Sequence, residues 1–189
     1  MSELRREMVQ KIVDSEARRN GRGEIIVYFL NPDDGGGRFE VAGVNDRYHP
    51  EKAAELRRLV EGGRPHDAEK EALEYIAAYT DRSAAISDNA GLKYNLRDCA
   101  WNRGPTGAVT IMQIALGVTA DGRFGPISQG ALHRAEEDVP DLLQRCRTAR
   151  ETYEKRRGRD ESSRYWEGLV ARWDRVLDEA IAYDSMRAS

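Results

Sequence analysis

Residues 98–132 constrain the fold of this chain most, because short breaks divide a pattern that is otherwise helical. The first break is the Asn-Arg-Gly-Pro sequence at 102–105, where proline begins a new helix since its missing N–H costs nothing there. Gly117 ends that helix, and the Asp-Gly and Gly-Pro pairs within 121–126 form turns before a third helix. The stretch therefore predicts a compact unit of three helices joined by tight turns.

One β-rich region near the N-terminus precedes further helical patterns. Residues 2–19 carry apolar side chains at helical spacing and are followed by an Asn-Gly pair. Residues 24–30 and 38–44 are rich in β-branched and aromatic side chains, and the loop 31–37 separates them, which predicts a hairpin with a long tip. Further helices are predicted over residues 49–62, 65–79, 92–102, 105–116, 126–135, 140–157 and 162–183.

These elements predict a mainly α protein of the α+β class with one N-terminal β-hairpin. A chain of 189 residues is long enough to bury the core of one domain. We therefore expect a single domain over residues 1–189. Within it, residues 1–48 would form the first helix and the hairpin, and residues 49–189 would form a helical lobe around 98–132.

The composition argues against several classes of function. A net charge of −3 gives no general reason to expect nucleic-acid binding, and the longest apolar run, residues 25–30, is too short to enter a membrane. The charged N-terminus lacks the apolar core of a signal peptide, so we expect synthesis in the cytoplasm. Two cysteines, expected in the core, and three scattered histidines do not suggest a metal site, so no metal or cofactor is expected.

Glu16 is the residue that most suggests chemistry. Leu4, Met8 and Ile12 follow one another at intervals of four, and Glu16 continues this row, so an acid stands where the pattern predicts a core side chain. Burial and the negative end of the helix dipole both favour the protonated form of a carboxyl group. A protonated carboxyl group can act as the general acid in glycoside cleavage. The alternative is a helix-end glutamate that turns into water.

The predicted hairpin and the residues after it carry further acids. These are Asp33, Asp34, Glu40 and, just beyond the hairpin, Asp46. A helix-end glutamate followed by such a hairpin can hold two carboxyl groups across one glycosidic bond. Acids in loops are also common in ordinary turns, so both interpretations remain open. Elsewhere, Asp98 and Asp121 are expected to be a helix-cap residue and a turn residue.

Residues 98–132 also contain a set of spaced motifs. They are Asp98-Cys99-Ala100-Trp101-Asn102-Arg103-Gly104-Pro105, Leu116-Gly117-Val118, Asp121-Gly122-Arg123-Phe124-Gly125-Pro126 and Ala131-Leu132. Here the chain resembles the muramidase family often named secretion-activator proteins, with its C-terminal predicted peptidoglycan domain. The resemblance implies a lysozyme-like fold, in which a glutamate at the end of the first long helix is the catalytic acid and a β-hairpin follows. It therefore implies that Glu16 is the acid.

The sequence around Glu16 departs from that family. The family has Glu-Gly-Gly-Tyr where residues 16–19 of this chain read Glu-Ala-Arg-Arg, and the hairpin here is longer. The longer hairpin is similar to that of bacterial chitosanases, another lysozyme-like branch, whose second acid lies in a Gly-Asp-Gly-Arg-Gly segment. The corresponding segment here is residues 33–38, which makes Asp34 the candidate second carboxylate and Glu40 the reserve.

We therefore expect a peptidoglycan hydrolase that cleaves the β-1,4-glycosidic bonds of cell-wall glycan by carboxyl acid/base catalysis. Glu16 would protonate the leaving oxygen, and Asp34 or Glu40 would orient water or stabilise the transition state. The candidate substrate-binding residues are Asn102, Tyr79 and Arg38.

Two alternatives stay open. A chitosanase-type hydrolase would suit the acids of the hairpin, because its glycan substrate is cationic. A non-catalytic peptidoglycan-binding module would account for the departure at residues 17–19. In the favoured interpretation the partner is the peptidoglycan glycan strand, the chain is a monomer, and another system exports or delivers it to the bacterial cell wall.

Overall fold

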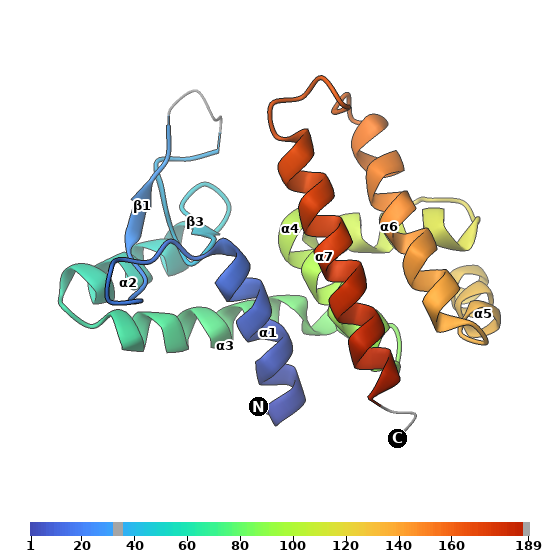
Figure 1. Cartoon of the computed structure of the whole chain (residues 1–189), viewed down its shortest axis with the longest axis horizontal. Coiled ribbons are helices and arrows are strands. Elements are labelled where there is room, and N and C mark those ends of the chain that lie inside the picture. The colour runs from blue at the N-terminus through green and yellow to red at the C-terminus, as the bar shows by residue number, and fades with distance from the viewer. Residues whose placement is uncertain (32–35, 187–189) are drawn as a thin grey trace. The chain divides into compact units, whose positions relative to one another are not determined.

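The structure, a computed structural model, describes residues 1–31 and 36–186 of the chain (Figure 1). The chain divides into two compact units, Met1–Ala78 and Tyr79–Ser189. Their border falls inside one helix, later in the chain than the predicted border between residues 48 and 49. The expectation of a single domain stays a prediction, and the two units are described separately below.

The first unit begins with α1, Glu3–Glu16, whose N-terminus is capped by the Ser2 hydroxyl. One face of α1 buries four apolar side chains, namely Met8, Val9, Ile12 and Val13. The helix ends at Glu16, earlier than the predicted end at Arg19, because the backbone of Ala17 is already extended. Arg19 then pairs with Ile25 in an isolated antiparallel bridge. The change in direction after Glu16 leaves this acid at the helix end, where the sequence predicts it.

The sheet of the first unit has three short antiparallel strands in the order β1-β2-β3. Strands β1, Val27–Phe29, and β2, Phe39–Val41, form the predicted hairpin. The third strand, β3, Val44–Asn45, lies within and just beyond the segment predicted as one strand. The chain reverses at Ala42 and Gly43, whose φ angles are 50° and 75°. The prediction of a single returning strand was therefore wrong.

Helix α2, Pro50–Glu61, packs against the sheet and buries Ala53 and Leu56 (Figure 1). The guanidinium of Arg57 lies 5.4 Å from the ring centre of Phe29 and 5.0 Å from that of Phe39. Because side chains alternate between the faces of a sheet, Phe29 and Phe39 mark the face covered by α2. Helix α3, Pro65–Ala84, then continues into the second unit.

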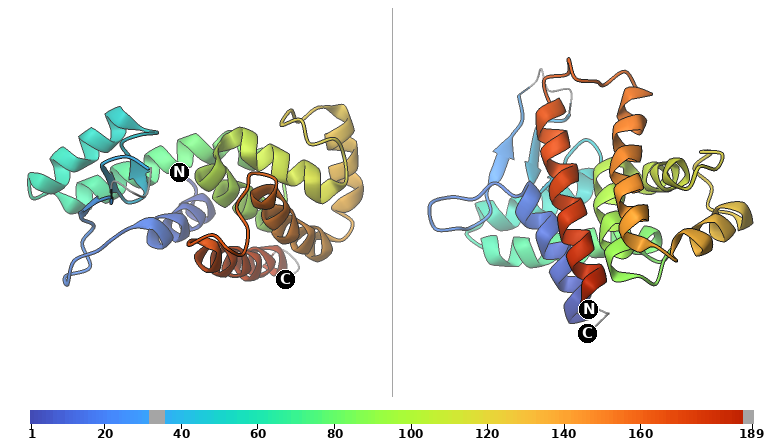
Figure 2. Two further views of the ribbon diagram at one scale, coloured as in Figure 1. Left: turned by 90° about the horizontal axis from the view of Figure 1, so that it is seen from above. Right: turned by 45° about the vertical axis from the view of Figure 1, so that its right-hand side comes forward.

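The second unit is helical throughout its described elements. They are α4, Ala90–Leu116, α5, Pro126–Ala135, α6, Val139–Lys155, and α7, Trp166–Ser185. Helices α4, α6 and α7 pack together, and α6 and α7 lie side by side (Figure 2). The two helices predicted over 92–116 are one element with a kink at Gly104, whose φ of 73° and ψ of 163° are not helical. The predicted class, mainly α with a small antiparallel sheet, is confirmed.

A buried ion cluster joins the three packed helices. Asp98, in the interior of α4, is only 1% exposed and accepts hydrogen bonds from Arg150 of α6 and Arg172 of α7. The two guanidinium groups outweigh the effect of burial and hold the pKa of the Asp98 carboxyl well below its usual range. The prediction of Asp98 as a helix cap was therefore wrong. No helix in the described residues is long and apolar enough to span a membrane.

Candidate functional site

Two glutamates come together where α1 meets the sheet. Glu16 is the last residue of α1 and Glu40 is the central residue of β2, and both side chains are half-buried. Burial, and after it the negative charge of Glu16, raise the pKa of Glu40 to about 7, although Arg18 opposes the rise. The structure therefore brings the candidate acid and the reserve carboxylate into direct electrostatic interaction.

Tyr28 lies beside this pair. It faces Glu40 across the hairpin in the β1–β2 register, so the two side chains share one face of the sheet. That face is opposite to the one covered by α2, and the Tyr28 side chain is 39% exposed. The Arg18 guanidinium lies 5.2 Å from the centre of the Tyr28 ring. An aromatic ring, a cation and two carboxyl groups thus gather at this site.

The two arginines that follow Ala17 have different roles. The backbone carbonyl of Arg18 accepts a hydrogen bond from Ile26, which holds this segment beside the residues leading into β1 and its side chain near the acid pair. Arg19 instead forms two hydrogen bonds to the Glu69 carboxylate of α3, at 2.6 and 3.1 Å, and another to Asp14. The unusual Arg-Arg sequence therefore supplies one residue to the site and one to the scaffold.

Arg18 and Tyr28 were not among the predicted site residues. The departure at residues 17–19 was the only sequence signal for Arg18. Tyr28 could be found only from the strand register, because its neighbours Val27 and Phe29 are also strand-forming residues and the sequence does not reveal which faces Glu40.

Arg38 and Asp46 form a scaffold contact in the hairpin. The Asp46 carboxylate accepts hydrogen bonds from the backbone N–H of Arg38 at 2.7 Å and of Phe39 at 3.3 Å, and from the Arg38 side chain at 2.9 Å. These bonds outweigh the effect of burial and lower the pKa of Asp46. Asp46 therefore stays charged and fixes the start of β2. Substrate binding by Arg38 stays a prediction, and Asp33 and Asp34 lie outside the described residues.

Tyr79 and Asn102, the other predicted substrate-binding residues, belong to the second unit. The Tyr79 ring packs edge-on against Trp101, with ring centres 5.6 Å apart, close to the kink at Gly104. Asn102 is half-buried, and its carbonyl accepts a hydrogen bond from the neighbouring Arg103. Their role in binding stays a prediction.

Other reactive side chains do not form a second centre in the described part of the chain. Cys99 and Cys146 are buried, as predicted, and burial raises their thiol pKa values to about 11 and about 12. Thiols with such pKa values are poor nucleophiles at neutral pH. Across residues 1–31 and 36–186, no group of three or more acidic, histidine or cysteine side chains has the arrangement of a metal site.

Comparison with known proteins identifies a shared fold. No protein-family model matches the sequence, and no curated protein matches it. Among solved structures, SagA of Brucella abortus is similar, with a TM-score of 0.64 over 94% of this chain and 94% of that chain. The two sequences are 19% identical over this alignment. At this identity the similarity shows the fold, and the chain therefore has the fold of SagA over most of its length.

Proposed function

We propose that this protein is a peptidoglycan hydrolase that cleaves the β-1,4-glycosidic bonds of cell-wall glycan. The observation that carries the proposal is the pair of Glu16 and Glu40, in which the pKa of Glu40 is raised to about 7. The shared fold with SagA and the motifs in residues 98–132 support it. Asp34 remains a candidate carboxylate outside the described residues, so the proposal uses Glu40.

Cleavage of a glycosidic bond requires one protonated and one charged carboxyl group. Burial and the charge of Glu16 raise the pKa of Glu40 to about 7, so Glu40 holds a proton up to near neutral pH. That proton passes to the leaving oxygen. The carboxylate that remains stabilises the positive charge on the sugar or activates the attacking water. These are the two roles that retaining and inverting glycosidases assign to their paired acids.

The groups around the pair fit a sugar substrate. Tyr28 offers a partly exposed aromatic face beside Glu40, and the flat apolar face of a sugar ring packs well on such a surface. Arg18 holds the Tyr28 ring from one side and limits the rise in the Glu40 pKa. We therefore assign Tyr28 a role in substrate binding and Arg18 a role in positioning.

The experiment that tests this function compares two glycans. Wild-type protein is incubated with purified sacculi and, separately, with chitosan oligomers, and new reducing ends are measured. We expect reducing ends and soluble muropeptides from sacculi and none from chitosan. Reducing ends from chitosan alone would establish the chitosanase alternative. Co-sedimentation with sacculi without new reducing ends would establish a binding module, and either result would contradict the proposal.

A further inference from the structure

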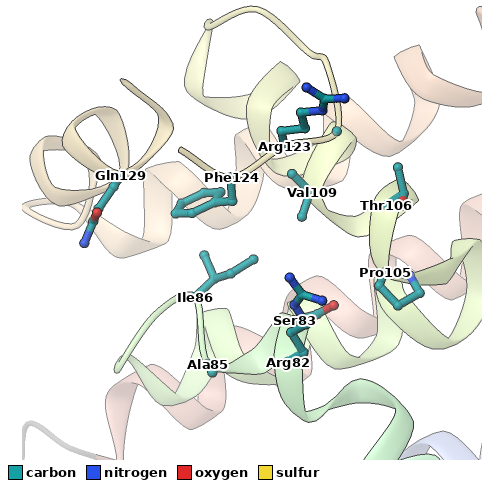
Figure 3. Close-up of a pocket in the computed structure, with 11 residues that line it drawn as sticks. Arg82, Ser83, Ala85, Ile86, Pro105, Thr106, Val109, Arg123, Phe124 and Gln129 are labelled. Atoms are coloured by element: carbon teal, nitrogen blue, oxygen red, sulfur yellow. The ribbon is translucent and has the colours of Figure 1, made fainter. Parts of the chain in front are cut away.

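The second unit contains a cavity of about 630 Å³ that involves none of the proposed catalytic residues. Its wall comes from the end of α3 and the residues after it, from the first turns of α4 after the kink, and from the turn before α5 and the start of α5 (Figure 3). The volume lies within the range of about 300–1,000 Å³ that is usual for ligand sites. The cavity is therefore large enough for a short peptide or a small organic ligand.

The lining of this cavity combines an apolar surface with two cations. Ile86, Val109 and Phe124 form the apolar part, and Arg82 and Arg123 lie on opposite sides of it (Figure 3). Within the described residues, neither guanidinium has an ion pair or a hydrogen bond, whereas Arg97, Arg103, Arg147, Arg150 and Arg172 of the same unit each have an acidic partner. The described lining also contains no acidic side chain. The side chains that line the cavity thus carry a net positive charge, and Asp121 in the adjacent turn interacts electrostatically with Arg123.

The cavity wall around Arg123 is held firmly. The buried Gln113 side chain of α4 donates hydrogen bonds to the Asp121 carboxylate at 2.8 Å, to the Arg123 carbonyl at 3.0 Å and to the Ser128 hydroxyl at 3.1 Å. It also accepts one from the Gly122 N–H at 2.8 Å. The Asp121 carboxylate therefore has hydrogen-bond partners within the turn, and these bonds hold the backbone of Arg123 in place.

The glycine of this turn allows its close approach to α4. Gly122 has a φ of 74°, and a Cβ added there would lie 2.7 Å from the Thr106 methyl carbon. A side chain at this position would push the turn away from α4 and open the cavity wall. The Asp-Gly-Arg-Phe-Gly-Pro motif thus forms one side of a cavity. None of its residues takes part in the proposed cleavage reaction.

We propose that this cavity binds the carboxylate-bearing stem peptide of peptidoglycan. Two unpaired guanidinium groups suit two carboxylates, because arginine pairs with a carboxylate through parallel hydrogen bonds. The apolar surface between Arg82 and Arg123 suits the methyl groups of the alanine residues that flank the two acidic residues of a stem peptide. This inference rests on the proposed function, since it takes the substrate of the protein to be peptide-bearing glycan.

The test measures binding of a free synthetic stem tetrapeptide, of sequence Ala-Glu-diaminopimelate-Ala, to the full-length protein by calorimetry. The variants are Arg82→Gln and Arg123→Gln, and Arg134→Gln is the matched control. Arg134 is an exposed arginine of α5 that has no ion pair in the described residues and does not line the cavity. Circular dichroism is recorded for each variant, and exposed arginines without partners should leave the fold intact.

We expect the wild type and Arg134→Gln to bind the peptide with equal affinity. Arg82→Gln and Arg123→Gln should each bind it at least about tenfold more weakly. Amidation of the peptide carboxylates should weaken binding to the wild type in the same way, and added salt should reduce the affinity. Absence of binding, equal binding by all variants, or equally tight binding of inorganic phosphate would overturn the proposal.

A parallel assay separates this inference from the proposed function. The wild type is incubated with sacculi from which an amidase has removed the stem peptides, and reducing ends are measured. Cleavage of this bare glycan without binding of the tetrapeptide would reject the stem-peptide site and keep the hydrolase. Binding of the tetrapeptide through Arg82 and Arg123 without cleavage of any glycan would keep the site and reject the hydrolase.

Discussion

Glu40 stands in a strand whose other two residues, Phe39 and Val41, are buried on the opposite face. Burial and the charge of Glu16 both disfavour the charged form of its carboxyl group. The nearby Arg18 offsets only part of this effect. A protein built only for stability would favour an apolar or neutral side chain here. A strongly raised pKa at a partly exposed surface is typical of functional sites, which is why Glu40 matters to the proposal.

The raised pKa of Glu40 makes folding stability depend on pH. Its pKa in the folded protein, about 7, exceeds the ordinary value of 4.5, so its contribution is fully present below pH 4.5 and is lost as pH rises through 7. Glu40→Gln removes the titration. After allowance for partial exposure, we expect the variant to gain about 1–2 kcal/mol of unfolding free energy relative to wild type between pH 4.5 and pH 8. Urea unfolding at both pH values measures this, and a constant difference would contradict it.

The buried Asp98 carboxylate predicts a different kind of effect. Asp98→Asn leaves the guanidinium groups of Arg150 and Arg172 without a counter-charge, and we expect it to lower the free energy of unfolding by about 3–5 kcal/mol. The control is Asp88→Asn, because Asp88 is fully exposed and contacts only Lys93 in a surface ion pair. Chemical denaturation of the two variants should separate them clearly. Similar small losses would mean that the buried cluster does not stabilise the fold.

At the scale of elements, α4 shows how a local break is absorbed into a longer helix. Pro105 cannot donate to the helix, and the Gly104 backbone is in a region that is almost restricted to glycine. The two halves nevertheless continue along one element, which carries Asp98 before the kink and Gln113 after it. The kink thus lets a single element contribute to both the ion cluster and the cavity.

The backbone of Gly104 leads to a prediction for α4. Gly104→Ala should lower the free energy of unfolding by about 1–3 kcal/mol, because alanine is strained at this φ and ψ. Space is not the cause, since the nearest neighbour of an added Cβ is the Tyr79 hydroxyl at 3.8 Å. The control is Gly130→Ala within α5, which should raise stability by about 0.5–1 kcal/mol. Thermal unfolding of both variants checks the two signs, and stabilisation by Gly104→Ala would contradict the assignment.

The sequence predicts elements better than it predicts contacts between them. Helical periodicity and proline positions locate α5 at 126–135, whereas α1 ends at Glu16, three residues before its predicted end at Arg19. The strand β3 and the pairing of Tyr28 with Glu40 depend on register, which local patterns do not specify. Asp98 was misassigned for the same reason, since its partners Arg150 and Arg172 lie more than fifty positions later in the chain.

At the scale of the whole molecule, the two candidate sites lie in different compact units. The carboxyl pair belongs to Met1–Ala78, and the arginine-lined cavity belongs to Tyr79–Ser189. A substrate that carries both a sugar chain and acidic peptides has a group for each site. Peptidoglycan is such a substrate, and this combination links the two proposals.

The proposed hydrolysis should depend on pH through the proton on Glu40. As pH rises above about 7, the Glu40 carboxyl group loses its proton. Because cleavage requires one protonated carboxyl group, we expect hydrolysis of sacculi to fall about tenfold for each pH unit well above 7. Initial rates measured between pH 5 and pH 9 test this. A rate that stays constant up to pH 9 would contradict the assignment of the proton.

The most direct test of the carboxyl pair is the rate at which reducing ends are released from sacculi by Glu16→Gln, Glu40→Gln and the control Glu24→Gln. Glu24 belongs to the same unit and contacts Asn20 outside the pair. Loss of a catalytic acid or base typically costs 10²-fold or more, so both pair variants should fall by about 100-fold or more. Glu24→Gln should match the wild type. Wild-type rates in Glu16→Gln and Glu40→Gln would show that these carboxyl groups do not perform the reaction.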